Sequence, residues 1–339
     1  MKKFKKFLAI FVCLFCAICV FYFGGFILAN TLENGTDGYY FTKNFLLEKT
    51  KGKPRIIIEA GSGSQFGINS LMIEREFKKF TLNMGYNAGY PLDLRLYRLA
   101  KHLGKDDIVV LPLEYIYYTF DKNEHQKGIL KELSGIGKFH FNALPLYKKI
   151  QVISKMSLKE SKKPFKNALN FIKFKLFNSE FDFDLKLDLN TLLAQNERGD
   201  ANLTLLKNQG YDFSKADNTT GLSCQQNLMV TGIKFSDSFK DYLSLIKEIS
   251  QNTGAKFIFT YPAMAGQNCY DFSTQIGKDF EILLEQIKNY VLSQGFDFVG
   301  DPLAFYFPND MLDAYYHLNE SARDLRTARL IDYLRPYFK

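Results

Sequence analysis

The segment IIIEAGSGSQFGI, residues 56–68, joins a run of isoleucines to a turn of small residues around Ser62. Isoleucine is enriched in strands, and glycine permits the tight backbone that a turn requires. Several α/β folds expose a nucleophilic serine in such a turn, at the carboxyl end of a strand. The segment therefore predicts a buried strand that ends in a candidate nucleophile, Ser62, with Ser64 as the alternative in the same turn.

A second segment, DAYYHLN at residues 313–319, contains the groups that such a serine needs. A serine hydroxyl is a weak nucleophile, and it requires a base at about 3 Å that is itself oriented by a carboxylate. His317 is the predicted base and Asp313 the predicted carboxylate. Asp310 stays open as an alternative to Asp313.

Strand and helix patterns alternate on both sides of a long interruption. Strands are predicted at 55–60, 80–84, 107–113, 256–261 and 296–299, and helices at 70–79, 92–103, 238–252, 273–293 and 319–334. This alternation predicts a three-layer α/β/α sandwich with a mostly parallel sheet, in which ligands bind at the carboxyl ends of the strands. The interruption, about residues 120–232, is predicted to be an insertion in a domain that spans residues 54–339.

The N-terminus predicts export. A basic tail at residues 1–6 precedes residues 7–29, which carry no charged side chain and are long enough to span a bilayer core of about 30 Å. The basic residues in front predict that the N-terminus stays in the cytoplasm. A signal anchor is therefore expected in the cytoplasmic membrane, followed by a linker at 30–53 and an extracytoplasmic domain. A cleaved signal peptide is the alternative, although its apolar region is usually only about 7–15 residues.

Two of the five cysteines, Cys224 and Cys269, lie outside the apolar stretch. An even pair in an exported domain predicts a disulfide, and two buried free thiols are the alternative. The net charge of +8 is concentrated in a lysine-rich amphipathic segment at 147–177. This segment could contact anionic headgroups or an acidic glycan, or could simply be a solvated helix. Nucleic acid is not an expected partner of an exported domain.

These blocks resemble the SGNH (GDSL) hydrolase superfamily, and most closely its membrane-anchored, exported branch. That branch includes peptidoglycan and alginate O-acetyltransferases and the D-alanyl-lipoteichoic acid transfer protein. The resemblance covers about residues 54–118 and 233–339, and it implies a flavodoxin-like arrangement of the sheet. Ser62 in Ala60-Gly61-Ser62 stands at the position of the family's nucleophile.

The other family blocks are matched in part. NMGYNAG at 83–89 resembles the block whose glycine amide binds the oxyanion, which implies Gly85 and Gly89 as donors. Asp313 and His317 resemble the last block, although the spacing here is Asp-x-x-x-His and the family's commonest spacing is Asp-x-x-His. The block Gly-x-Asn-Asp reads PLEY here, so Glu114 follows the third strand, and a carboxylate cannot donate to an oxyanion unless it is protonated.

Four further residues are candidates for substrate binding because they lie at or near expected strand ends or the last block: Glu114, Asn87, Tyr261 and Tyr316. Asp200-Ala201-Asn202-Leu203-Thr204 fits the acidic extended sequon of bacterial N-glycosylation, so Asn202 is a candidate glycosylation site in a stretch predicted to be exposed. No metal and no cofactor are expected.

The sequence thus predicts an exported serine acyltransferase that acts on hydroxyls of a cell-envelope glycan. Because acyl-CoA is absent outside the cytoplasm, a membrane protein that supplies the acyl group is an expected partner. An O-acetyl esterase of the same glycans is the alternative within this chemistry. A non-catalytic glycan-binding or assembly factor is the alternative from another class, and the missing Asn-Asp block favours it.

Overall fold

The computed structural model describes residues 2–31, 38–120, 138–154, 166, 169, 173, 194–208, 235–265, 269–308, 310–312 and 314–338. Residues 2, 21–31, 38–40, 138–140, 152 and 153 are described for their backbone alone. The chain divides into two compact units. Met1–Asp37 and Lys127–Asp188 form the first, and Gly38–Gln126 and Leu189–Lys339 form the second.

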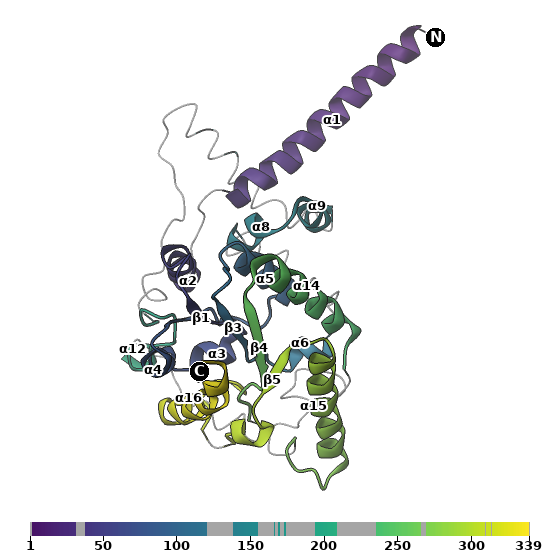
Figure 1. Cartoon of the computed structure of the whole chain (residues 1–339). Helices are drawn as coiled ribbons and strands as arrows, with labels where there is room; N and C mark the ends of the chain where they lie inside the picture. Colours follow the sequence, from purple (N-terminus) through teal and green to yellow (C-terminus); the bar gives the residue numbers. More distant parts are fainter. Residues whose placement is uncertain are drawn as a thin grey trace. The chain divides into compact units, whose positions relative to one another are not determined.

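A five-stranded, all-parallel sheet with strand order β2-β1-β3-β4-β5 lies at the centre of the second unit (Figure 1). Its strands are β1 (Arg55–Ile58), β2 (Phe80–Asn83), β3 (Ile108–Leu111), β4 (Lys256–Thr260) and β5 (Asp297–Val299). All residues of β1 and β3 are buried, as expected for a parallel sheet flanked by helices. The predicted α/β fold with a parallel sheet is confirmed.

The helices that flank the sheet begin and end within a few residues of their predicted positions. They are α4 (Ser70–Phe77), α5 (Leu92–Ala100), α14 (Asp237–Thr253), α15 (Gln275–Ser293) and α16 (Glu320–Leu334). Helix α5 packs against α14, and α4 packs against α16. Short helices α3 (Ser62–Gly67), α6 (Ile116–Thr119) and α12 (Leu203–Asn208) and the 3-10 turns η2 (Pro302–Phe305) and η3 (Arg335–Phe338) complete the described part of this unit.

Side-chain caps fix where the helices begin. Asn319 accepts the N–H of Ala322 and starts α16, as its sequence position predicts. Asn69 accepts the N–H of Met72 in the same way and starts α4. At its carboxyl end α14 stops at Gly254, whose φ of +75° suits glycine.

Part of the segment predicted to be a linker, residues 30–53, is helical. Half of it is helix α2 (Gly38–Lys49), in which Lys43 and Leu47 are fully buried. These two residues are four apart and therefore share a face of the helix. This helix is hard to predict from the sequence, because the apolar residues of the segment do not form one stripe.

Helix α16 exposes a large apolar side chain and buries a charged one. Leu325 is 48 % exposed, whereas Arg326 is 1 % exposed. Arg326 is buried because its guanidinium donates to backbone carbonyls of α3. A hydrophobic pattern cannot reveal a helix face that is held by a buried arginine.

The insertion predicted at 120–232 does not behave as one piece. Residues 127–188 fall in the first unit and residues 189 onward in the second. Residues 194–208 pack beside α3, where Ala194, Ala201 and Leu203 form a buried cluster with Phe66. The end of the insertion is therefore part of the sheet domain.

In the first unit α1 (Lys2–Thr31) contacts α8 (Lys138–Ala143), and α9 (Leu146–Ser154) follows. Helix α1 covers the segment where the sequence predicts an anchor. Among the residues that the structure describes, no helix combines the length and the apolar character that crossing a membrane requires. Of the lysine-rich segment at 147–177, most residues after 154 lie outside the described part of the chain.

An ion pair at the amino end of the sheet is expected to stabilise the fold. Asp107 accepts Nε and Nη2 of Arg55, and both side chains are buried. Removing one partner of a buried pair costs about 3–5 kcal/mol. Asp107→Asn should therefore lower the free energy of unfolding, measured by urea denaturation, by about that amount.

Asp297→Asn is the control, because its ion pair with Lys256 is about half exposed. Exposed pairs contribute only about 0–1 kcal/mol. Equal losses for the two variants would contradict a structural role of the buried pair.

Candidate functional site

Ser62 lies at the carboxyl end of β1, where the chain turns directly into α3. Every other residue from Arg55 to Ile68 is buried, but Ser62 is partly exposed. No hydrogen bond to its Oγ or its backbone N–H is present among the described residues. Ser64 is fully buried instead, and its hydroxyl donates to the Gly61 carbonyl at 3.3 Å. Of the two serines, only Ser62 can meet a substrate without rearrangement.

Glu114 accepts the two N–H groups on either side of Ser62. Its Oε2 lies 2.7 Å from the Gly61 nitrogen, and its Oε1 lies 2.8 Å from the Gly63 nitrogen. Burial raises the pKa of the Glu114 carboxyl, and these N–H groups oppose that rise. The residue that stands in place of the family's asparagine is thus a buried acceptor and faces the turn.

Asn83, the last residue of β2, connects the turn to two other segments. Its Nδ2 donates to the Ser64 carbonyl at 2.9 Å and to Asp200 Oδ1 at 2.8 Å. Its Oδ1 accepts the N–H of Gly85 at 2.9 Å. Asp200 also accepts the N–H and the hydroxyl of Ser70 at the start of α4. One amide side chain therefore fixes α3, the loop after β2 and the end of the insertion together.

Lys43 of α2 contacts the same two segments, the end of β2 and the end of the insertion. Its Nζ donates to the carbonyls of Asn83, at 2.7 Å, and Gly199, at 2.5 Å. Burial lowers the pKa of Lys43 to about 7, and the charges of Asp200 and Glu59 oppose this change. Arg95 also lies in this buried layer, where it pairs with Glu59 and donates to the carbonyls of Ala60 and Tyr86.

The C-terminal segment lies against α3. The His317 ring stacks on Phe66 with a centroid separation of 4.2 Å and an angle of 17°. Phe66 is one helical turn after Ser62, so both side chains lie on a similar face of α3. A Cβ built on Gly63 would lie 3.0 Å from the Tyr316 Cβ. The structure therefore brings Tyr316 and His317 to the serine turn and α3, and among the described residues no hydrogen bond joins Ser62 to His317.

Arg326 holds the opposite side of the turn from Glu114. Its Nη1 donates to the carbonyls of Gly63, at 3.3 Å, and Gly67, at 3.1 Å. Asp313 lies outside the described residues, so its place beside His317 stays a prediction. Asp310 accepts the backbone N–H of Asn319 through its carbonyl and the Asn319 side chain through Oδ1. That places Asp310 at the start of α16.

The glycines expected to bind an oxyanion already use their N–H groups. That of Gly85 donates to Asn83, and that of Gly89 donates to Asn87 Oδ1 at 2.8 Å. Asn87 itself is exposed, and no acceptor of its Nδ2 is present among the described residues. A Cβ built on Gly61 would clash with the side chain of Ala88, so Asn87 lies in the loop that adjoins the serine turn.

The two tyrosines that are candidates for substrate binding, Tyr261 and Tyr316, are both buried. Tyr261 is 3 % exposed and Tyr316 is 7 % exposed, and burial raises the pKa of both phenols. Tyr261 packs against Phe298 with ring centroids 4.7 Å apart. Both side chains belong to the hydrophobic core of the sheet domain. The sequence could not reveal this, because a tyrosine at a strand end can face in or out.

The predicted glycosylation stretch is not freely exposed. Asp200 is 1 % exposed and serves the network described above, and Asn202 accepts the N–H of Leu205 at the start of α12. Only Thr204 of the sequon is exposed. Asn202 itself is partly exposed, so its glycosylation stays a prediction.

Cys269 is buried and disulfide-bonded. Cys13, Cys16 and Cys19 are free. Cys224 lies outside the described residues, so its pairing with Cys269 stays a prediction.

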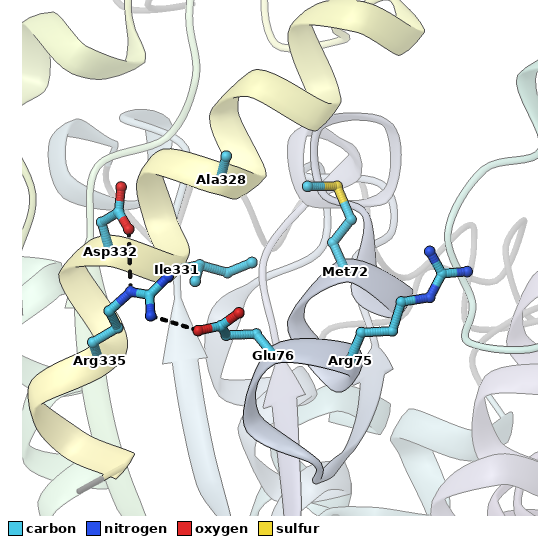
Figure 2. Close-up of a pocket in the computed structure, with 7 residues that line it drawn as sticks. All are labelled: Met72, Arg75, Glu76, Ala328, Ile331, Asp332 and Arg335. Carbon is cyan, nitrogen blue, oxygen red and sulfur yellow. Dashed lines mark hydrogen bonds and ion pairs between the residues drawn. The ribbon is translucent and has the colours of Figure 1, made fainter.

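A pocket of about 350 Å³ between α4 and α16 is separate from this site. Figure 2 shows its lining, in which Arg335 pairs with Glu76 at 2.6 Å and with Asp332 at 3.2 Å. Met72 and Ile331 also line it. None of the candidate residues around Ser62 contributes to the lining, and Arg335 is already paired with two carboxylates.

Sequence reasoning missed three residues that position the site: Asn83, Asp200 and Arg326. Asp200 was interpreted through its sequon, which concealed a structural carboxylate. Asn83 follows a predicted strand directly, and that position was a usable signal.

No protein-family model matches the chain, and no curated protein matches its sequence. The resemblance to SGNH hydrolases therefore stays a prediction from the residue blocks.

Lys43 should give the stability of the protein a characteristic pH dependence. The unfolded chain keeps the ordinary lysine pKa of 10.5, whereas the folded protein holds it at about 7. Between these values the unfolded chain binds more protons, so the free energy of unfolding should rise with pH by at most about 1.4 kcal/mol per unit. This contribution is lost as pH falls through the folded pKa.

Lys43→Met should flatten the dependence between about pH 7 and 10, measured by urea denaturation at several pH values. Lys207→Met, which removes an exposed lysine of α12, is the control and should leave the slope unchanged. The same slope in Lys43→Met and the wild type would show that Lys43 does not titrate this way.

Proposed function

We propose that this protein is a serine acyltransferase of the SGNH hydrolase type, with Ser62 as its nucleophile. The observation that carries the proposal is the state of the serine turn. Glu114 occupies the N–H groups of Gly61 and Gly63, while the Oγ and N–H of Ser62 remain unbonded among the described residues. A nucleophile and an oxyanion donor on one exposed residue are what acyl transfer requires.

The proposed reaction has two steps. Ser62 Oγ attacks the carbonyl of an acyl donor, and its proton passes to His317. The tetrahedral oxyanion accepts the N–H of Ser62, with Asn87 Nδ2 as a second donor from the neighbouring loop. Collapse expels the leaving group with the proton from His317 and leaves an ester on Ser62. A sugar hydroxyl then attacks this ester, and His317 again accepts and returns the proton.

His317 needs to approach Ser62 for this chemistry. Its stacking on Phe66 places the imidazole beside α3, one turn from the nucleophile. Catalytic hydrogen bonds are often absent without substrate and form in the complex. Asp313 would orient the imidazole, as the sequence predicts.

The proposed acceptor is a cell-envelope glycan, and the proposed acyl donor is delivered by a membrane protein. Both follow from export, for which the basic tail and apolar stretch at the N-terminus are the support. Large apolar side chains of α1, including Phe7 and Val20, are exposed. An esterase would use the same residues with water in place of the sugar hydroxyl.

One observation favours a non-catalytic binding protein of the same fold. The predicted oxyanion donors Gly85 and Gly89 are occupied, and Glu114 replaces the family's donor asparagine. Such a protein would retain the fold and the partly exposed Ser62 without forming an acyl-enzyme.

The test is to incubate the full-length protein with p-nitrophenyl acetate and to follow nitrophenol release and intact mass. The wild type should release a burst of nitrophenol and gain one acetyl group. Ser62→Ala should lose both. Ser64→Ala, which alters a buried hydroxyl two residues away, should retain them.

A slow phase after the burst indicates a transferase that waits for its acceptor, and continuous fast release indicates an esterase. An adduct that persists in Ser62→Ala would refute the assigned nucleophile. Absence of both adduct and release in the wild type would favour the binding protein.

A further inference from the structure

Glu114 accepts hydrogen bonds from backbone N–H groups of the serine turn. It follows β3 closely in sequence, is 1 % exposed, and has one oxygen on Gly61 and the other on Gly63. Ser62 lies between these two glycines. The carboxylate therefore fixes the peptide planes on both sides of the nucleophile.

Arg326 donates hydrogen bonds to backbone carbonyl groups of the same turn and of α3. It is also 1 % exposed and donates to Gly63 and Gly67 from α16. Glu114 and Arg326 form no direct ion pair in the described part of the chain. The charge of Glu114 nevertheless raises the pKa of Arg326 and so favours the charged guanidinium, against the effect of burial.

The glycines of the turn permit this close approach. A Cβ on Gly63 would lie 2.8 Å from Glu114 Oε1, and one on Gly67 would lie 2.5 Å from Arg326 Nη1. Both distances are shorter than a side-chain carbon tolerates. The small residues around Ser62 are therefore required by the two buried charges as well as by the turn.

Burying two charged side chains to hold a turn costs free energy, because both lose contact with water. Burial raises the pKa of Glu114 and lowers that of Arg326 to about 10, so burial opposes both charged forms. Replacing such pairs with apolar side chains often stabilises a protein. An arrangement that costs stability and lies against a reactive residue is typical of a functional site.

We infer that Glu114, opposed by Arg326, is the positioning residue for Ser62, a role that rests on the proposed function. It leaves the N–H of Ser62 as the one amide of the turn that faces the reacting carbonyl. An amide side chain cannot replace it. Glutamine would accept one N–H, but its own NH₂ group would face the other.

Glu114→Gln tests this role in the full-length protein. Acetylation of Ser62 should slow by about 100-fold, which is the cost of misplacing a reacting group by about 1 Å. The concentration of p-nitrophenyl acetate that gives half the maximal burst rate should change little. Amide hydrogen exchange in a peptide covering residues 60–68 should become faster.

Asp107→Asn is the matched control. Asp107 is a buried acid just before β3, as Glu114 is a buried acid just after it, and it contacts Arg55 far from the turn. This variant should lose stability and keep the wild-type acetylation rate in its folded fraction. Its exchange at 60–68 should match the wild type at a pH where global unfolding is negligible.

Three results would overturn the inference. They are an acetylation rate in Glu114→Gln within about threefold of the wild type, unchanged exchange at 60–68, or an equal slowing in Asp107→Asn. A wild type without any adduct would instead overturn the proposed function. If the wild type forms no adduct but amide exchange at 60–68 is faster in Glu114→Gln, Glu114 supports the structure of the turn without positioning a nucleophile.

If Glu114→Gln fails to fold, Arg326→Lys provides the same test. Lysine keeps the charge but cannot reach both carbonyls in the fixed geometry of a guanidinium. Slower acetylation with faster exchange at 60–68 supports the role, and wild-type behaviour in both measurements contradicts it.

Discussion

Between β1 and α3 the chain passes from strand to helix within a few residues and still leaves one serine accessible. The hydrogen bonds from Gly61 and Gly63 to Glu114 hold the backbone of this turn in place. A buried carboxylate is unfavourable unless it accepts hydrogen bonds, and the two N–H groups of the turn donate them. The rest of the site is arranged around the same few peptide groups. Asn83 at the end of β2 and Arg326 from α16 take carbonyls of α3. Neighbouring strands and a helix thus converge on one turn.

This convergence explains why the carboxyl end of the sheet is polar and yet rigid. Parallel strands bring their last residues to one edge, so Glu114, Asn83 and Glu59 meet there although they are far apart in sequence. Each is buried and paired, with Arg95 bonded to Glu59 and to carbonyls of the neighbouring loop. Ser62 is the exception within β1 and α3, since it is partly exposed and its Oγ and N–H make no hydrogen bond within the described part of the chain. The proposed function rests on this contrast between the buried, hydrogen-bonded residues around the turn and the partly exposed Ser62.

The order of strands and helices could be predicted because it depends on local patterns. The isoleucines of β1 and the cap at Asn319 are examples, and both lie where the sequence places them. The contacts of the site could not be predicted in the same way. The burial of Lys43 and Arg326 depends on carbonyl groups of other segments, and the role of Asp200 depends on the return of the insertion to α3. Such partners leave no periodicity in the sequence.

The most direct test of the account is to label the full-length protein with a fluorophosphonate and to map the modified residue by peptide mass spectrometry. A fluorophosphonate reacts with a serine that a base activates beside an oxyanion donor. The account predicts one label per chain, on Ser62, and its loss when the protein is unfolded before labelling. Labelling of another serine, or no labelling of the folded protein, would contradict it.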